Sequence, residues 1–213
     1  MRQDSLILYH GSKSGIIGEI KPISREYCDY GSGFYMGTEK QQPLTLICNY
    51  PEAKLYTMEL ELAGLKVLSL DVNIEWALAI AFFRGKMKNF KDSPLYNKYS
   101  ILFSGYDVID GYIVNDRMFV VLDRFFGGEI TDSALTNSLS ALKLGKQYAA
   151  ITEKACKNIK ILDENRLSEK EREKLIILSE DNRQKGIELA DRICRDHRRE
   201  GLFFDEIMRS EQF

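Results

Sequence analysis

The sequence predicts an α+β fold, and three observations support this prediction. Short apolar segments bounded by glycine and other turn residues recur up to residue 162, which is typical of strands. Between them lie segments with helix-capping residues, such as residues 74–84 after Asn73. From Asp163 the chain becomes highly charged, and its apolar residues follow helical spacing. We therefore expect a mixed domain over residues 1–162 and a helical C-terminal extension over residues 163–213.

The composition, net charge, and cysteine and histidine counts of the 213-residue chain restrict the classes of function that it can have. Hydrophobic residues make up 44%, which is enough for a packed core, and 30 basic against 32 acidic residues give no overall attraction to nucleic acid. Four cysteines lie far apart and only two histidines are present, which excludes a disulfide framework and a His-rich metal site and favours a reducing, cytoplasmic location. We find no signal peptide and no apolar run of membrane-spanning length.

The mixed domain is expected to alternate strands with short helices. The expected strands cover residues 6–9, 34–36, 54–62, 67–70, 106–114, 147–151 and 159–162. Thr38 is expected to cap a first helix, and residues 74–84 are apolar nearly all round, which predicts a buried helix. Further helices are expected over residues 118–126 and 131–144, whereas residues 86–100 are interpreted as a polar segment with a turn at Ser93-Pro94.

The extension is expected to be one long or two shorter amphipathic helices that run from the N-cap Ser168 to about Arg199. A basic cluster near its end is either a solvated helix face or a contact for a phosphate-rich partner. Beyond Gly201, Leu202-Phe203-Phe204 is expected to form an exposed apolar end.

Residues 29–37, DYGSGFYMG, are the first candidate for chemistry, with three glycines and three aromatics in nine residues. Glycine allows a positive φ and lets a ligand approach the main chain closely. Aromatic side chains beside such a backbone offer flat apolar faces for a planar ring. The alternative interpretation is a turn before a buried strand whose Tyr and Phe belong to the core.

His10 is the second candidate, in the segment LYHGS of residues 8–12. A histidine at a strand end can bind a ribose hydroxyl through its ring, and Gly11 leaves its backbone N–H and C=O open to a carboxamide. The alternative is an ordinary surface or core histidine whose hydrogen bonds are satisfied within the fold.

These two segments resemble the ADP-ribosyltransferase signature of the diphtheria-toxin and poly(ADP-ribose) polymerase type, in which one strand carries His-Gly-Ser/Thr and a later strand carries Gly-x-Gly-Ile/Phe-Tyr. More narrowly, the chain resembles the bacterial family called domain of unknown function 3990. The matching pieces occur in that family's order and cover roughly residues 6 to 162. They are YHGS at 9–12, DYGSGFY at 29–35, EW at 75–76, YDVI at 106–109, NDR at 115–117, QY at 147–148 and TEKA at 152–155.

The resemblance implies a split β-sheet core with an NAD+-binding cleft between two small sheets and no metal. The catalytic residues would be His10 on a ribose hydroxyl, Tyr35 stacked on nicotinamide, and Gln147 where the superfamily usually has a glutamate. We expect these three side chains to meet around nicotinamide and its ribose. Gln147 accepts a hydrogen bond but brings no negative charge, so it stabilises an oxocarbenium-like state less well than a carboxylate. The other NAD+-binding residues would be Gly11, Ser12, Tyr30, Gly33, Phe34, Asn115, Asp116 and Arg117.

A carboxylate from elsewhere could assist the reaction. Asp116 is the first candidate, with a helix N-cap as the equally weighted alternative, and Glu153 is the second. Arg117 is either a pyrophosphate ligand or a solvated surface charge. Tyr50 is the nearest aromatic after Tyr35 for the other face of nicotinamide.

The expected function is therefore transfer of ADP-ribose from NAD+ to an unknown protein or nucleic-acid acceptor, in the manner of a bacterial toxin. A small antitoxin-like protein bound to the tail is the expected partner, and no membrane is involved. The alternatives are an NAD- or ADP-ribose-binding module with weak or no catalysis, and an NAD glycohydrolase with water as acceptor. Replacing Gln147 with Glu is expected to raise turnover.

Overall fold

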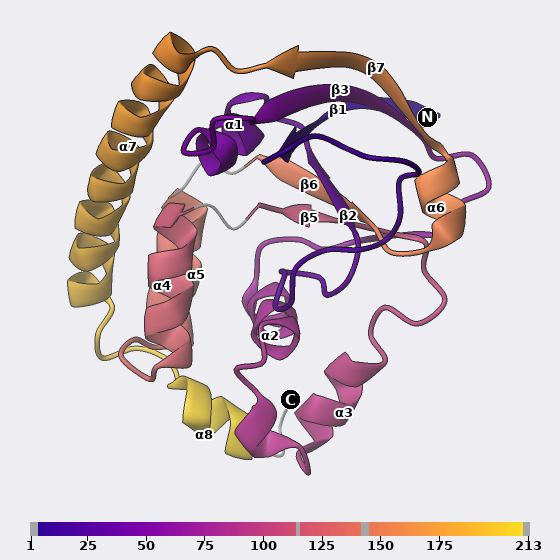
Figure 1. The fold of residues 1–213 in the computed structure, drawn as a ribbon. Coiled ribbons are helices and arrows are strands. Elements are labelled where there is room, and N and C mark those ends of the chain that lie inside the picture. The colour runs from indigo at the N-terminus through magenta and orange to yellow at the C-terminus, as the bar shows by residue number, and fades with distance from the viewer. Residues whose placement is uncertain (1–3, 114–115, 142–144, 211–213) are drawn as a thin grey trace.

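The computed structural model describes residues 4–113, 116–141 and 145–210, with the side chains of residues 116–119 outside that description. Its fold is mixed α+β, built on one seven-stranded sheet in the order β4-β5-β6-β2-β1-β3-β7 (Figure 1). Neighbouring strands are antiparallel except for β4 and β5. The strands are β1 Ser5–Ser12, β2 Phe34–Gly37, β3 Lys54–Glu61, β4 Val67–Ser69, β5 Val108–Tyr112, β6 Lys146–Ala150 and β7 Ile159–Arg166.

The centre of the sheet, between β1 and β2, is its most weakly paired place. β1 pairs with β3 over its whole length, from Ser5 opposite Glu61 to Ser12 opposite Lys54, but it meets β2 only where Tyr9 lies opposite Gly37. We call this place the β1–β2 junction. The two separate small sheets implied by the resemblance are thus one sheet whose halves share a single register pair. All four residues of β2 pair with β6 on its other side, so the weak pairing is confined to the edge that faces β1.

The helices are α1 Gln41–Ile47, α2 Ile74–Phe83, α3 Pro94–Ser100, α4 Asp116–Phe126, α5 Asp132–Ala141, α6 Glu153–Lys157, α7 Glu169–Asp196 and α8 Phe204–Arg209, with a 3-10 turn at Lys88–Phe90. The expected buried helix is confirmed as α2, and the Asn73 side chain accepts a hydrogen bond from the Trp76 N–H at 2.9 Å. Trp76 and the residues that follow it up to Ala81 are fully buried, because α2 is apolar on all sides.

Two apolar clusters hold the sheet. The larger one packs α2, α4, α5 and α8 against the face of the sheet that carries Ile109 and Ala149. The smaller one, on the other face, joins Leu8, Phe34 and Tyr148 to residues 155–156 of α6. Side chains alternate between the two faces along each strand, so each face of the sheet carries its own apolar cluster.

Two predictions, a helix cap at Thr38 and a turn at Ser93-Pro94, differ from the structure. Thr38 does not cap α1, whose N-cap position is Lys40 with no side-chain bond. Instead the Thr38 hydroxyl binds the backbone of Lys146, at 3.3 Å to its carbonyl and 3.1 Å to its N–H, so it extends the pairing of β2 with β6. Ser93-Pro94 is not an isolated turn but the start of α3, because Ser93 accepts from the Tyr96 N–H at 3.1 Å and proline fits the first helical position.

The tail is part of the folded body. Ser168 starts α7 with a capping box. Its hydroxyl accepts from the Glu171 N–H, and the Glu171 carboxylate accepts from the Ser168 N–H. Helix α7 then runs beside α4 and α5 (Figure 1). The predicted boundary after residue 162 lies inside β7, which pairs with β3 up to Arg166.

One of the three residues of the expected exposed apolar end is buried. Phe204 is only 2% exposed and joins the larger cluster with Ile207 and Met208. The prediction was wrong at Phe204 because α8 begins there and turns its apolar side inward. Only Leu202 and Phe203 remain exposed, at 40% and 38%, so the apolar end that suggested a protein partner is reduced to these two side chains.

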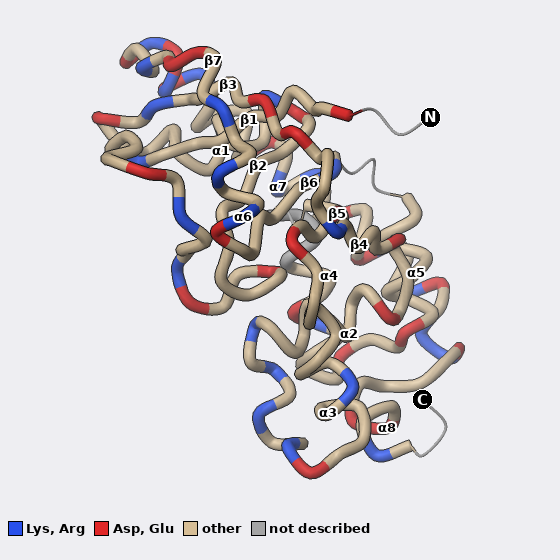
Figure 2. Tube along the Cα trace, turned by 90° about the vertical axis from the view of Figure 1, so that its right-hand side faces the viewer, with Lys and Arg blue, Asp and Glu red and all other residues tan. Residues whose placement is uncertain are grey.

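Charges of both signs are distributed over all parts of the chain, as Figure 2 shows. Among the described helices, none combines the length and apolar character needed to cross a bilayer.

Candidate functional site

Tyr35 is held by the turn that precedes its own strand. Its hydroxyl donates to the Gly31 carbonyl at 2.7 Å and accepts from the Tyr30 N–H at 3.0 Å. The turn needs glycine at position 31, where φ is +76° and an added Cβ would lie 2.9 Å from the Phe83 ring. Residues 29–31 therefore fold back over the phenol of Tyr35.

Gln147 lies on the same face of the sheet. Gly37 pairs with Gln147 and Tyr35 with Ala149, so the side chains of Tyr35 and Gln147 point to one side. The Gln147 amide nitrogen donates to the Asp29 carboxylate at 3.0 Å and to the Tyr112 carbonyl at 3.1 Å. Both partners can only accept, so the amide orientation is fixed, with its oxygen as the remaining acceptor.

Asp29 binds Gln147 and also forms an ion pair with Arg84. Its Oδ1 accepts from Arg84 Nε at 2.9 Å and Nη2 at 2.6 Å, while its Oδ2 accepts from Gln147. Asp29 is 8% exposed and Gln147 7%. A carboxylate so far from water requires such charge-assisted bonds to remain ionised. The site thus contains a buried negative charge one hydrogen bond from Gln147.

Tyr30 closes the network on the side of α2. Its hydroxyl donates to the Tyr112 carbonyl at 3.2 Å and accepts from the Trp76 indole N–H at 2.9 Å. Burial raises the pKa of the Tyr30 and Tyr35 phenols well above the usual value of tyrosine. Both hydroxyls therefore stay protonated at neutral pH and can donate the hydrogen bonds described.

His10 lies at the β1–β2 junction but on the opposite face. Its Nδ1 is 2.7 Å from the Tyr35 carbonyl oxygen, and its ring stacks on Phe34 with centroids 4.3 Å apart. A carbonyl only accepts, so Nδ1 carries the proton and Nε2 is the acceptor of the neutral ring. Burial lowers the pKa of His10, and the hydrogen bond to Tyr35 offsets only part of this effect.

Gly11 is the point at which α1 presses on β1. An added Cβ there would lie 2.8 Å from the Pro43 carbonyl oxygen and 3.0 Å from the Ile47 side chain. Next to it, Ser12 accepts from the Gly15 N–H at 3.0 Å and stabilises the turn that ends the strand. At Gly33, an added Cβ would lie 3.2 Å from the Ala150 carbonyl. The glycines at 11 and 33 therefore allow close packing of helix and strand.

The structure brings together some of the predicted site residues and not others. Tyr30, Tyr35 and Gln147 form one network, whereas the side chains of His10 and Phe34 lie on the other face because Tyr9, not His10, is opposite Gly37. Of the three residues expected to meet around nicotinamide and its ribose, Tyr35 and Gln147 share one face of the sheet and His10 lies on the other. His10 is connected to Tyr35 through the backbone carbonyl at the junction instead.

Other predicted residues lie apart from this network or outside the described part of the chain. Tyr50 is 37% exposed, with the Lys13 ammonium 4.3 Å from its ring centroid. Glu153 is exposed in the first turn of α6. Asn115 and the side chains of Asp116 and Arg117 lie outside the described residues.

Sequence reasoning missed Asp29 and Arg84 as site residues. Asp29 stood within the glycine-rich motif, so a carboxylate inside a candidate ligand-binding loop was a signal that could have found it. Arg84 follows α2 and gave no local signal, because its role depends on a contact between residues 55 positions apart. No group of three or more His, Cys, Asp or Glu in the described part of the chain is arranged to hold a metal ion.

Comparison with known families places most of the chain within a described family. The family with the description "Protein of unknown function (DUF3990)" matches residues 6–161. Comparisons with curated proteins and with solved structures gave no match.

Proposed function

The chain belongs to the DUF3990 family, whose match covers β1 to the first half of β7, and from this premise we propose that it is an NAD+-dependent ADP-ribosyltransferase. The observation that carries the proposal is the His10–Tyr35 contact at the β1–β2 junction. It fixes a neutral imidazole beside Gly11, and the pairing between β1 and β2 does not extend to Gly11. A ligand at this junction would touch groups from both faces of the sheet.

In the proposed reaction, the bond between nicotinamide nitrogen and ribose C1′ breaks, and its electron pair leaves with neutral nicotinamide. An acceptor nucleophile then bonds to C1′ and releases a proton. His10 Nε2 would accept from a ribose hydroxyl, and the Gln147 amide oxygen from the 2′-hydroxyl next to the developing positive charge. Tyr35 would contribute its ring face and, through its hydroxyl, the shape of the 29–31 turn.

Asp29 changes what we expect of Gln147. Its carboxylate is 3.0 Å from the Gln147 amide nitrogen, so a Gln147→Glu substitution would put two carboxylates in one site. Two carboxylates this close do not both ionise, and one of them takes up a proton. The single substitution would therefore add little negative charge, contrary to the simple expectation from sequence.

The double variant Asp29→Asn with Gln147→Glu keeps one carboxylate and one amide in the same hydrogen bond. We expect it to release nicotinamide from NAD+ faster than Gln147→Glu alone, because the carboxylate now stands on the strand next to the ribose. Chromatography of the released nicotinamide gives the rates of the single and the double variant. If the single variant is the faster one, the shared-proton argument is wrong.

The proposal itself is tested by incubating the protein with NAD+ labelled in its adenine and with cell lysate. We expect label on a macromolecule and free nicotinamide in equal amounts. His10→Ala should weaken NAD+ binding by about tenfold, the value of one lost hydrogen bond to a polar group. His197→Ala removes the only other histidine, at the end of α7, and should change nothing. Absence of both products, with no NAD+ binding by calorimetry, would end the proposal.

The second candidate is a binding module for NAD+ or ADP-ribose without turnover. It is favoured by the Asp29–Arg84 pair, because the guanidinium neutralises the carboxylate that binds Gln147. Binding of NAD+ by calorimetry with no nicotinamide released would select it. Free ADP-ribose as the only product would instead indicate an NAD glycohydrolase.

A further inference from the structure

Strand β7 is an open edge of the sheet. It stands last in the strand order, and in the described part of the chain it pairs with β3 only. It is eight residues long, and Figure 1 shows it as the outermost strand, with α6 and α7 at its two ends. Such an edge presents unpaired N–H and C=O groups to any strand that can lie beside it.

The same edge exposes apolar side chains. Ile161 is 43% exposed and Leu162 47%. The register against β3 shifts at this point, because Met58 is opposite Ile161 and Thr57 is opposite Asp163. Leu162 is thus the extra residue of a β-bulge and has no opposite residue in β3. A large apolar side chain therefore stands in water at the middle of the edge strand.

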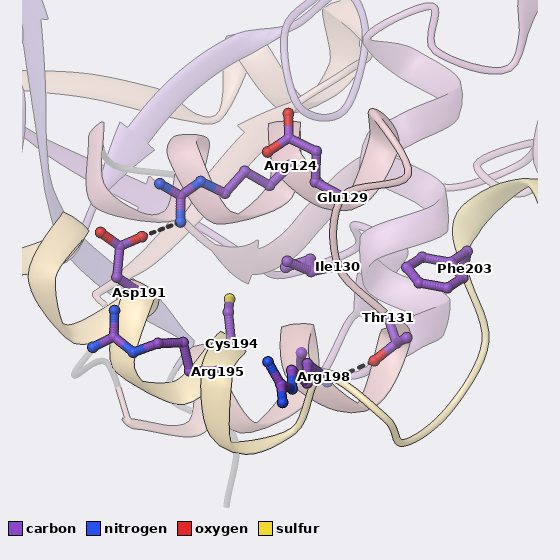
Figure 3. A pocket seen from close by; sticks show the side chains of 10 residues that line it. Arg124, Glu129, Ile130, Thr131, Asp191, Cys194, Arg195, Arg198 and Phe203 are labelled. Atoms are coloured by element: carbon purple, nitrogen blue, oxygen red, sulfur yellow. Dashed lines mark hydrogen bonds and ion pairs between the residues drawn. The ribbon is translucent and has the colours of Figure 1, made fainter.

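The tail that follows β7 is fastened to another part of the molecule. Helix α7 packs beside α4 and α5. An ion pair between Arg124 and Asp191, drawn in Figure 3, joins α7 to α4 near the end of α7. The Arg195 guanidinium lies beside the same carboxylate. These contacts hold α7 along the helices and leave the outer side of β7 open.

The phase of the β3–β7 ladder identifies the main-chain groups that face outward. The Glu61 N–H donates to the Asn158 carbonyl at 3.0 Å, and the Leu167 N–H donates to the Ala53 carbonyl at 3.1 Å. Hydrogen-bonded and non-hydrogen-bonded pairs alternate along an antiparallel ladder. Counting inward from both ends gives the residues of β7 whose main-chain groups face away from β3, which are Ile159, Ile161, Glu164 and Arg166.

We propose that β7 pairs antiparallel with β7 of a second copy of this chain, about a two-fold axis between Leu162 and Asp163. In this register the outward-facing groups of the two copies meet, because Ile161 of each copy lies opposite Glu164 of the other. The two Leu162 side chains become neighbours at the axis and leave water. The dimer does not depend on the proposed transferase activity.

The charges of β7 agree with this arrangement. Lys160 and Asp163 point to one face of the sheet, because they are opposite Glu59 and Thr57 of β3. Antiparallel pairing puts Lys160 of each copy opposite Asn165 and within diagonal reach of Asp163 of the other. Within the described residues, Lys160 has no ion pair in its own chain. Parallel pairing in register would instead put the two lysines side by side.

This association stops at two copies. The pairing uses the β7 edge of both, and the edges that remain are the β4 strands, each only three residues long. So short an edge offers little to a further strand. The two-fold contact is therefore closed and does not lead to a filament.

Sedimentation equilibrium of the full-length protein tests the proposal. One strand pair is a small interface, so we expect a dimer with a dissociation constant of about 10–100 µM. Leu162→Lys puts like charges together at the axis and should weaken the dimer at least about tenfold. Leu202→Lys is the matched control, because Leu202 is 40% exposed and lies beyond the end of α7. It should leave the dimer unchanged.

An exchange of charge tests the register. Lys160→Asp should weaken the dimer, because the new carboxylate comes close to Asp163 of the other copy. Adding Asp163→Lys restores opposite charges and should recover the affinity. Thermal unfolding of each variant checks that it is folded. A protein that stays monomeric well above the expected dissociation constant overturns the proposal and leaves the edge to a strand of a different protein. Equal weakening by Leu162→Lys and Leu202→Lys, or no recovery in the double variant, also overturns it.

Discussion

At the scale of single residues, the buried carboxylate of Asp29 gives a prediction about stability. Replacing it with Asn leaves one acceptor for Gln147 but removes the charge that Arg84 binds through two nitrogens. Breaking a buried ion pair from one side costs about 3–5 kcal/mol of unfolding free energy. Asp123→Asn, in the exposed pair of Asp123 with Lys86, should cost less than about 1 kcal/mol. Urea unfolding measures both, and similar losses would contradict the burial argument.

A second prediction at this scale concerns the close packing of Gly111 against Tyr30. An added Cβ would lie 2.0 Å from the Tyr30 hydroxyl oxygen, so Gly111→Ala should destabilise the protein by about 1–3 kcal/mol through overpacking. Combining it with Tyr30→Phe removes that oxygen and should recover part of the loss. A double-mutant cycle measured by urea unfolding provides the check. Strict additivity of the two losses would show that the contact is not the cause.

His10 gives the protein a pH dependence with a definite sign. Its pKa is lower in the folded protein than the unfolded value of about 6.5, mainly because it is buried. Between the two values the unfolded chain binds more protons, so the free energy of unfolding falls as pH falls below about 6.5 and is fully present above it. His10→Gln should therefore show a shallower loss of stability between pH 7 and pH 5 than the unaltered protein. Equal slopes in urea titrations would refute this.

Much of this residue-level detail was not predictable from sequence, for identifiable reasons. Tyr35 and Gln147 were located on strands correctly, whereas β1 continues beyond the predicted end at residue 9 and includes His10. Which face each side chain occupies depends on the register of β1 against β2, and a shift of one residue reverses it. Partners such as Asp29 and Arg84 are joined only by tertiary contact, which local patterns do not encode.

At the scale of elements, capping residues were the most informative signals. Asn73 and Ser168 each start the helix predicted for them, because their side chains satisfy N–H groups that the helix leaves open. Thr38 failed as a cap because pairing with Lys146 competes for the same hydroxyl. A cap signal therefore fails where a neighbouring strand takes up the hydroxyl, as at Thr38.

Helix α7 allows the contribution of an N-cap residue to stability to be tested. Ser168→Ala removes the hydroxyl that binds the Glu171 N–H at 3.3 Å, and loss of an N-cap costs about 1 kcal/mol. Ser179→Ala lies in the interior of the same helix and should be neutral or slightly stabilising, because alanine has the higher helix propensity. Thermal unfolding of the two variants gives the comparison. A larger loss for Ser179→Ala would contradict the capping role.

At the scale of the whole molecule, the tail completes the core. Phe204 packs edge-on against Phe125 with centroids 5.5 Å apart and is 2% exposed. Phe204→Ala should therefore cost about 3–5 kcal/mol, as large-to-small changes of buried aromatic residues do. Leu202→Ala, two residues earlier and 40% exposed, should change stability by less than about 0.5 kcal/mol. Equal effects in urea unfolding would mean that α8 is not a structural part of the domain.

The position of α8 has a consequence for the order in which the fold can form during synthesis. Its core residues Phe204, Ile207 and Met208 follow every strand of the sheet along the chain. Synthesis from the N-terminus therefore completes the sheet before it supplies these side chains of the larger cluster. A product that stops before Phe204 would lack the packing that the finished core requires.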